Sequence, residues 1–190
     1  MRNTVVVFAR APRLGTVKRR LARDIGDRAA LRFHAATLHG LLRSLRRDRR
    51  FRTVLAATPD GAHVPLPWPV PRIGQKSGDI GMRMDRACGR FRHGNVLIIG
   101  SDIPDACAAD AIAAFRALGS ADAVFGPAAD GGYWLVGMGP RRPARPFANA
   151  RWSSEHALAD TLANFRGRKT ALMRTLRDVD TAADLPSSRR

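Results

Sequence analysis

Short apolar runs alternate with longer amphipathic segments along this chain. The runs have the length and composition of buried strands and cover residues 4–9, 53–57, 95–99, 122–125 and 133–136. The clearest amphipathic segment follows the first run, and the leucines on its apolar face are Leu31, Leu38, Leu41, Leu42 and Leu45. Strands that alternate with helices form βαβ units, so the pattern predicts an α/β fold with a mostly parallel, doubly wound sheet.

Residues that favour helix termini and turns divide these segments. Asp27 is expected to cap the leucine-patterned helix, and further helices are expected over 79–91, over 108–118 and from Ser153, whose hydroxyl suits an N-cap. The segment 64–71 contains four prolines and is expected to be an extended loop. Because no repeat, low-complexity tract or linker interrupts residues 1–190, the sequence predicts one domain.

Composition excludes several classes of protein. A chain of 190 residues that is 45% hydrophobic can bury a core without disulfides or a structural metal. Cys88 and Cys107 match neither a zinc site nor a disulfide framework, which favours a reducing, cytoplasmic compartment. No apolar stretch approaches the roughly 20 residues that cross a bilayer, so we expect no membrane partner.

The charge indicates an anionic partner. Lysine and arginine number 33 against 16 acids, for a net charge of +17, although an arginine-rich surface is also what a GC-rich coding sequence produces. The basic residues concentrate in the first 50 positions, whereas residues 95–138 contain only Arg116 against several aspartates. Since only 6% of the residues are aromatic, small phosphorylated ligands are favoured over nucleic acid.

The carboxyl ends of the predicted parallel strands are where ligands are expected. After the first strand comes a basic loop that leads into a helix, in which Gly15 permits close backbone approach and Arg10, Arg13 and Lys18 supply charge for phosphate oxygens. The alternative is an ordinary turn with solvated arginines. No Walker or dinucleotide glycine pattern decides between the two.

Aspartates follow two later strands. The run at 96–99 ends in Gly-Ser-Asp, and Asp102 there is suited to hold Mg²⁺ or Mn²⁺ together with substrate phosphates, unless it only caps the next helix. The Asp130-Gly131-Gly132 stretch is typical of a hairpin turn, which its spacing favours. The functional alternative makes Asp130 a second acid of the same cleft, as a metal ligand or a general base.

Three weaker signals remain. Gln75, Gly78 and Gly81 precede a helix and form either a base-reading segment or a flexible loop. In the segment 178–185, Asp178 and Asp180 share one side if the chain is extended, and Thr181 with Asp184 resembles a capping box, which is the favoured interpretation. The histidines are scattered, with His34 and His39 in the leucine-patterned segment and His63 and His93 near loops; they have no spaced ligand partners and are expected to be structural.

Taken in order, these motifs resemble a bacterial family of GT-A-like, glycosyltransferase-like proteins. The matching pieces are FARAPRLGTVKRRLA at 8–22, QKSGDIGMRM at 75–84, GSDIP at 100–104, GPAADGGYWLVG at 126–137, the Trp152-Ser153 pair and DVDTAADL at 178–185. The resemblance implies the fold of the nucleotide-diphospho-sugar transferases, with a divalent metal at Asp102. It also implies kinship with small-molecule nucleotidyltransferases, but the first loop is poorer in glycine than theirs, which favours a nucleotide-diphosphate sugar over a triphosphate.

The sequence therefore predicts a metal-dependent transferase that moves a sugar from a nucleotide diphosphate. Asp102 would hold Mg²⁺ or Mn²⁺ against the diphosphate, and Lys18 would neutralise the diphosphate oxygens. Asp130 would either complete the metal shell or deprotonate the acceptor hydroxyl. The remaining substrate-binding residues are expected to be Arg10, Arg13, Gly15, Gln75, Gly78, Gly81, Arg83, Ser101, Gly131, Gly132 and Trp152. This arrangement requires Asp102 to lie beside the 10–18 loop.

Two other functions stay open. One is nucleotidyl transfer from a nucleoside triphosphate to a phosphorylated small molecule, with release of pyrophosphate. The other is a non-catalytic basic protein that binds RNA or acts as a scaffold.

Overall fold

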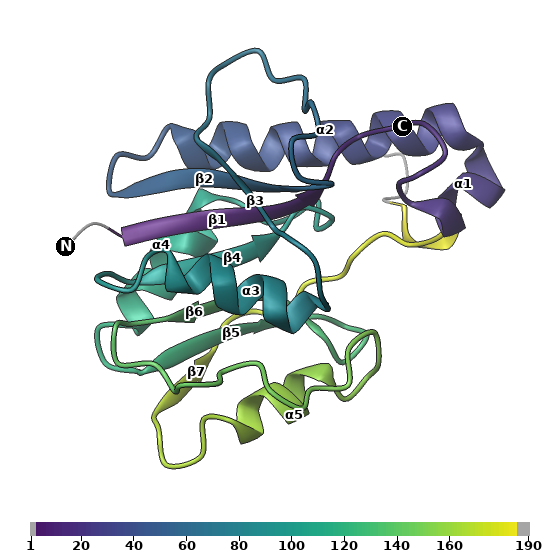
Figure 1. The fold of residues 1–190 in the computed structure, drawn as a ribbon. Helices are drawn as coiled ribbons and strands as arrows, with labels where there is room; N and C mark the ends of the chain where they lie inside the picture. Colours follow the sequence, from purple (N-terminus) through teal and green to yellow (C-terminus); the bar gives the residue numbers. More distant parts are fainter. Residues whose placement is uncertain (1–2, 186–190) are drawn as a thin grey trace.

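A seven-stranded sheet runs through the computed structural model, which describes residues 3–185 (Figure 1). The strands are β1 (Asn3–Arg10), β2 (Phe51–Thr58), β3 (Arg72–Gly74), β4 (Val96–Gly100), β5 (Ala123–Pro127), β6 (Tyr133–Met138) and β7 (Thr170–Leu172). Their order is β3-β2-β1-β4-β6-β5-β7, and all neighbours are parallel except β6, which is antiparallel to β4 and β5. The predicted α/β fold with a mostly parallel sheet is confirmed.

Helices cover both faces of this sheet (Figure 1). They are α1 (Arg19–Ile25), α2 (Asp27–Arg46), α3 (Ile80–Gly89), α4 (Ala108–Ala117) and α5 (Ala157–Ala163), followed by a 3₁₀ turn, η1 (Ala182–Asp184). Side chains of β1 alternate between two cores, because successive strand residues face opposite sides. Val5 and Val7 pack with α2 and α4, whereas Val6 and Phe8 pack with α3 and α5. The doubly wound arrangement follows from this alternation.

Two of the predicted helix starts are wrong. The N-cap of α2 is Gly26, and Asp27 is the first helical residue, where its carboxylate faces the positive end of the helix dipole. The last predicted helix does not begin near Ser153, whose backbone is left-handed with φ 59°. It begins at Ala157, where the amide of Leu158 donates to the carbonyl of Gly131 in the β5–β6 hairpin at 3.1 Å. A tertiary contact thus sets that boundary.

The final described segment crosses the carboxyl ends of the strands. After β7 it passes below α1 on the right of Figure 1. The side chain of Val179 in this segment is buried against Leu21 of α1 and Ala30 of α2. The backbone nitrogen of Ala182 donates to the Asp24 carboxylate at 2.9 Å. Thr181 and Asp184 form the predicted capping box at η1. This docking brings the chain around Val179 to the end of the sheet where β1 and β4 stop.

No helix within residues 3–185 has the length and apolarity required to cross a membrane.

Candidate functional site

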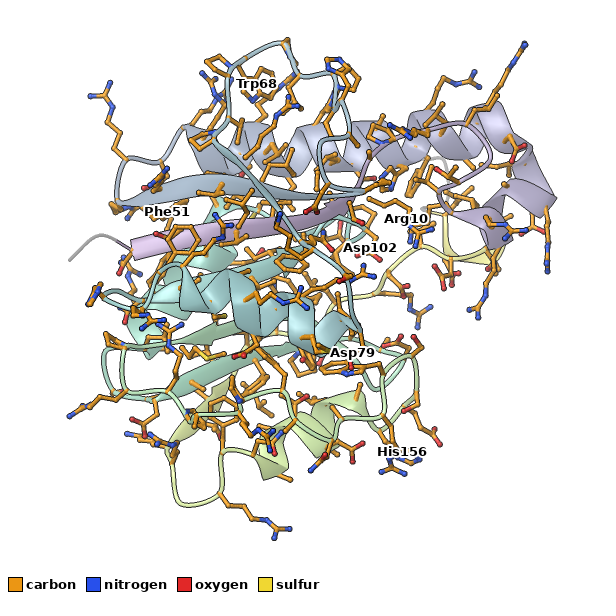
Figure 2. All side chains as sticks on the ribbon, viewed as in Figure 1. Arg10, Phe51, Trp68, Asp79, Asp102 and His156 are labelled. Atoms are coloured by element: carbon orange, nitrogen blue, oxygen red, sulfur yellow. The ribbon has the colours of Figure 1, made fainter. Side chains whose placement is uncertain are left out.

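The ends of β1 and β4 bring the two principal motifs together. Beyond the last paired residues of these strands, the Ser101 nitrogen donates to the Phe8 carbonyl at 3.1 Å, so the chain after β4 continues alongside the end of β1. Arg10 and Asp102 consequently lie at the same end of the sheet, far from Phe51 at the opposite end (Figure 2). The carboxyl ends of parallel strands meet at one edge, which is why residues distant in sequence converge here.

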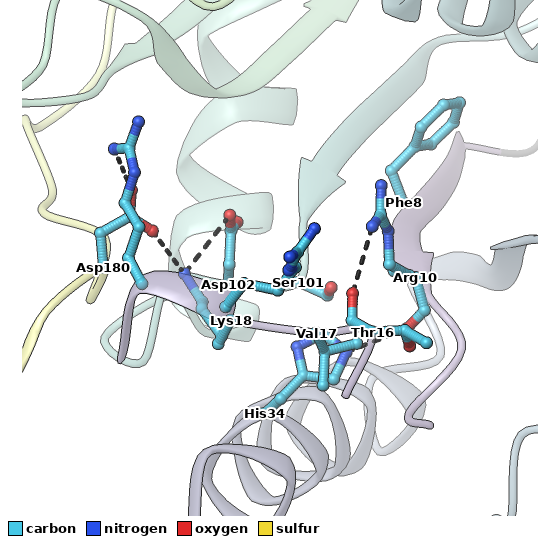
Figure 3. A pocket seen from close by; sticks show the side chains of 11 residues that line it. Phe8, Arg10, Thr16, Val17, Lys18, His34, Ser101, Asp102 and Asp180 are labelled. Atoms are coloured by element: carbon cyan, nitrogen blue, oxygen red, sulfur yellow. Dashed lines mark hydrogen bonds and ion pairs between the residues drawn. The ribbon is translucent and has the colours of Figure 1, made fainter. Parts of the chain in front are cut away.

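Lys18 links three segments of this edge (Figure 3). Its Nζ lies 3.2 Å from Oδ1 of Asp180 and 3.8 Å from Oδ2 of Asp102. The lysine backbone is left-handed, with φ 45° and ψ 49°, and its side chain is only 7% exposed, whereas that of Asp102 is 50% exposed. The ammonium is therefore held in place between two carboxylates, and Asp102 keeps an open face toward solvent.

A cavity of about 390 Å³, which we term the basic cavity, opens between the 10–20 loop and the end of β4 (Figure 3). Its charged lining consists of four basic side chains and two acidic ones, namely Arg10, Lys18, Arg19, Arg20, Asp102 and Asp180. Arg10 also donates to the Thr16 carbonyl at 3.2 Å and so holds the loop closed upon itself. This excess of positive charge suits a phosphate-bearing ligand.

Arg13 and Gly15 shape the loop without lining the basic cavity. Gly15 has φ 72°, a conformation that a residue with a β-carbon rarely adopts, and the Thr16 nitrogen donates to the Arg13 carbonyl at 3.2 Å. Gly15 thus makes the turn that returns the chain toward Lys18.

A second cavity of about 330 Å³, the acidic cavity, lies on the other side of Asp102. Among the residues that the structure describes, the charged side chains of its lining are Asp102, Asp130 and Asp178. Its walls are otherwise formed by aromatic, aliphatic and small residues, among them Ile80, Met84, Tyr133, Trp134, Trp152, Ser153 and Ser154. Asp102 lines both cavities, so one carboxylate forms the boundary between a basic and an acidic compartment.

Asp178 and Asp180 belong to this site. Val179 between them is buried against Leu21, and because side chains alternate along an extended segment, its two neighbours face away from that cluster. Asp180 lines the basic cavity and Asp178 the acidic one. The sequence signal for this placement is the pair of acids two positions apart, whose side chains share one side of an extended segment. The sequence favours a capping box for the same segment, and the structure contains both the cap and the two cavity-lining acids.

Burial raises the pKa of the Asp178 carboxyl above its usual value. The negative charge of Asp180 raises this pKa further, Lys18 opposes the rise, and Asp102 and Asp130 add to it. The site therefore holds several carboxylates close enough to interact electrically, a condition that a bound cation would relieve.

Asp130 occupies the tip of the β5–β6 hairpin, which confirms the turn expected there. Its Oδ1 accepts a hydrogen bond from the Gly132 nitrogen at 2.9 Å. A β-carbon on Gly131 would lie only 2.2 Å from the backbone oxygen of Glu155, so glycine is needed for the tip to pack against the 153–156 segment. Trp152, the residue before that segment, lines the acidic cavity.

The substrate-binding residues predicted in the 75–83 segment, which are Gln75, Gly78, Gly81 and Arg83, line neither cavity. Gln75 is buried, and its Nε2 donates to the carbonyls of Ala9 at 3.2 Å and Ala56 at 2.8 Å. Arg83 donates to the Gly78 carbonyl at 2.8 Å, which closes the loop before α3. Gly81 packs against Trp152, since a β-carbon there would lie 2.5 Å from the indole. The amide nitrogen of Gln75 is thus used to join strands.

His34 supports the floor of the basic cavity. Its Nε2 lies 2.9 Å from the Arg10 carbonyl, which can only accept, so we assign the proton to Nε2. Burial lowers the pKa of this imidazole, and the nearby positive charge of Lys18 lowers it further, while the hydrogen bond to the carbonyl opposes the shift. A neutral His34 that anchors the loop agrees with the structural role expected of it.

The donor set suits a metal that arrives with a phosphorylated ligand. Within residues 3–185, no three His, Cys, Asp or Glu side chains converge closely enough to enclose a metal ion. Mg²⁺ is commonly held by one or two carboxylates, with substrate phosphates and water completing its shell. The half-exposed carboxylate of Asp102 beside the basic cavity meets that requirement.

A family model described as an uncharacterized protein conserved in bacteria, DUF2064, matches residues 41–154. Among curated proteins, no match to this chain is found. Solved structures match over nearly the whole chain. A provisional nucleotide-diphospho-sugar transferase from Desulfovibrio desulfuricans G20 is 25% identical, with a TM-score of 0.88, and the match covers 99% of this chain and 90% of that one.

Two more distant structures share the fold. CMP:2-keto-3-deoxy-manno-octonic acid synthetase in complex with CTP is 8% identical, with a TM-score of 0.58, over 96% of this chain and 95% of that one. A Mycobacterium tuberculosis H37Rv protein in complex with manganese is 15% identical, with a TM-score of 0.51, over 97% of this chain and 96% of that one. The fold is thus that of transferases that use nucleotides.

Proposed function

We propose that this chain, which belongs to the DUF2064 family of proteins conserved in bacteria, transfers a sugar from a nucleotide diphosphate to an acceptor hydroxyl in a metal-dependent reaction. The observation that carries the proposal is the position of Asp102 at the boundary of the two cavities, with the Lys18 ammonium 3.8 Å away. A group transfer needs a site for each partner, and it needs the reacting atoms to meet where the two sites join.

The basic cavity is the proposed site of the diphosphate. Lys18, Arg10 and Arg20 would bind its oxygens, and the side chain of Lys18 is already held in place by Asp180. Positive groups fixed before the reaction stabilise the charge that develops on the leaving group, and they need no reorganisation at that moment. The similarity to a provisional nucleotide-diphospho-sugar transferase supports this assignment.

Asp102 would hold the divalent ion against the diphosphate. A bound Mg²⁺ or Mn²⁺ supplies Lewis-acid stabilisation of the departing diphosphate. The manganese complex of the distant Mycobacterium tuberculosis structure supports this assignment for the shared fold.

The acceptor would enter from the acidic cavity. In the transfer, the acceptor oxygen forms a bond to the anomeric carbon, while the bond from that carbon to the diphosphate oxygen breaks and its electron pair leaves with the diphosphate. Asp130, which is exposed at the hairpin tip, would accept the hydroxyl proton.

Calorimetry on Asp102→Asn tests the assignment. With UDP as the probe and Mn²⁺ at equal concentration, we expect Asp102→Asn to weaken binding at least ten-fold, because the neutral amide loses the charge that holds the metal. Asp105→Asn is the matched control, since Asp105 is an exposed aspartate three positions away that lines neither cavity. Unchanged metal-dependent binding by Asp102→Asn would remove the central role of this carboxylate.

Nucleotidyl transfer is the second candidate, because the fold is shared with a synthetase that was crystallised with CTP. A thermal-shift panel of nucleoside triphosphates and nucleotide sugars, with and without Mn²⁺, separates the donors. Pyrophosphate release from one of the four triphosphates would favour nucleotidyl transfer over sugar transfer. Strongly salt-dependent RNA binding without any nucleotide-induced thermal shift would instead favour the non-catalytic RNA-binding alternative.

A further inference from the structure

The two cavities that meet at Asp102 differ in charge. Basic side chains outnumber acidic ones in the basic cavity, whereas residues 3–185 contribute three carboxylates and no lysine, arginine or histidine to the lining of the acidic cavity. The whole chain carries a net charge of +17. Because the charged side chains that the described residues place in the acidic cavity are all carboxylates, this cavity repels anions and attracts cations.

Asp178 contributes charge to the acidic cavity without a partner of its own. The neighbouring Asp180 is paired with Lys18 and Arg20, each at 3.2 Å, but Asp178 forms no ion pair within residues 3–185. If a cation engages Asp102, the carboxylate of Asp178 still faces the cavity. An unpaired, partly buried carboxylate is suited to pair with a positively charged group of a ligand.

Aromatic rings line the same cavity. Trp152 contacts Tyr133 edge to face, with ring centroids 6.3 Å apart, and it packs closely against Gly81 of α3. Both rings line the acidic cavity together with the carboxylates. An aromatic face beside carboxylates is an arrangement that binds organic ammonium groups, since the ring and the carboxylate both attract positive charge.

We propose that the acceptor is a hydroxylated amine, such as an amino sugar or an amino alcohol, and that it carries no phosphate. Its protonated amine pairs with Asp178 beside Trp152, and its hydroxyl reacts at the wall formed by Asp102. This inference rests on the proposed function, because it takes the basic cavity as the donor site. Asp178 then determines acceptor specificity, a role distinct from metal binding at Asp102.

Three ring-matched probes test the charge preference: glucosamine, glucose and glucose 6-phosphate. Calorimetry is performed with the full chain saturated with UDP and Mn²⁺. We expect glucosamine to bind at least ten-fold more tightly than glucose, and glucose 6-phosphate to bind most weakly. Asp178→Asn should weaken the binding of glucosamine by a factor at least ten times larger than the factor for glucose. Asp105→Asn should leave the ratio of the two dissociation constants unchanged. Thermal unfolding of both variants verifies that they fold.

Glucose 6-phosphate binding as tightly as glucosamine would overturn the inference. Failure of all three probes to bind, or an equal effect of Asp178→Asn on glucosamine and glucose, would overturn it as well. Binding of UDP with Mn²⁺ is measured first in the same cell. If UDP binds and the amine preference is missing, only the acceptor class is wrong; if UDP does not bind, the proposed function fails and this inference falls with it.

Discussion

Replacement of Lys18 by methionine separates a ligand-binding role of this lysine from a structural one. The change removes the ammonium that lies between Asp102 and Asp180, but it keeps an unbranched side chain of similar length. It also keeps a β-carbon at a residue with φ 45°, so the backbone strain of the left-handed conformation is the same in both proteins. Any difference in behaviour therefore comes from the charge.

The two roles predict effects of different size. Both aspartate partners are about half exposed, and ion pairs with such solvent access contribute about 0–1 kcal/mol to stability, so the melting temperature of this 190-residue chain should fall by no more than about 4 °C. A hydrogen bond to a charged ligand contributes about 1.5–3 kcal/mol, so loss of one diphosphate contact should weaken UDP binding roughly 10- to 150-fold. Calorimetry with Mn²⁺ and thermal unfolding measure the two quantities.

Lys76→Met is the matched control for this variant. Lys76 is also a left-handed lysine, with φ 66°, and its Nζ lies 3.4 Å from the Asp60 carboxylate, but it lines neither cavity. We expect Lys76→Met to bind UDP as the unmodified chain does. If Lys18→Met binds UDP within two-fold of the unmodified chain, the basic cavity is not the diphosphate site and the reasoning is refuted.

Two further predictions concern stability. Gly131 has φ 84°, and a β-carbon there would lie 2.2 Å from the Glu155 backbone oxygen. We therefore expect Gly131→Ala to lower the free energy of unfolding, measured in urea, by about 2–4 kcal/mol. A loss below about 0.5 kcal/mol would contradict the tight packing of the hairpin tip. Burial by itself raises the pKa of Asp110, but hydrogen bonds from Arg174 and from the Cys107 nitrogen hold this pKa below its usual value. A lowered native pKa stabilises the fold above the unfolded pKa of about 3.9, and that contribution disappears as the pH falls through the native pKa. Arg174→Ala should therefore cost about 1–2 kcal/mol at pH 7, and this cost should shrink as the pH falls below the unfolded pKa; a cost that does not change with pH would exclude this linkage.

Much of the fold and part of the site could be predicted from local patterns. The apolar runs located β1, β2, β4, β5 and β6, because a buried strand needs consecutive apolar residues whatever its neighbours are. The strand ends then located Arg10, Lys18 and Asp102, since parallel strands present their carboxyl ends at one edge. The short strands β3 and β7 escaped detection because three residues are too few to show a periodicity.

Some residues have a role that local patterns do not specify. Gln75 precedes a helix in the sequence, but the fold buries its amide against the carbonyls of Ala9 and Ala56, which belong to two other strands. Ser153 is a good N-cap by residue type, yet the hairpin tip at Gly131 binds the first turn of α5 four residues later. In both cases a hydrogen bond from a distant segment prevails over the local preference.

The chain by itself predicted which end of the sheet holds the candidate site, and the structure places the predicted basic residues Arg10 and Lys18 in the lining of a cavity there. Only the tertiary structure decided that Asp102 separates two cavities of opposite charge and that Asp178 and Asp180 lie on either side of that boundary. The physical reason is the burial of Val179 against Leu21, a contact between segments almost a full chain length apart. The periodicity of a sequence predicts which side chains of one segment share a face. The contact of Val179 with Leu21, in contrast, depends on where α1 lies in the folded protein.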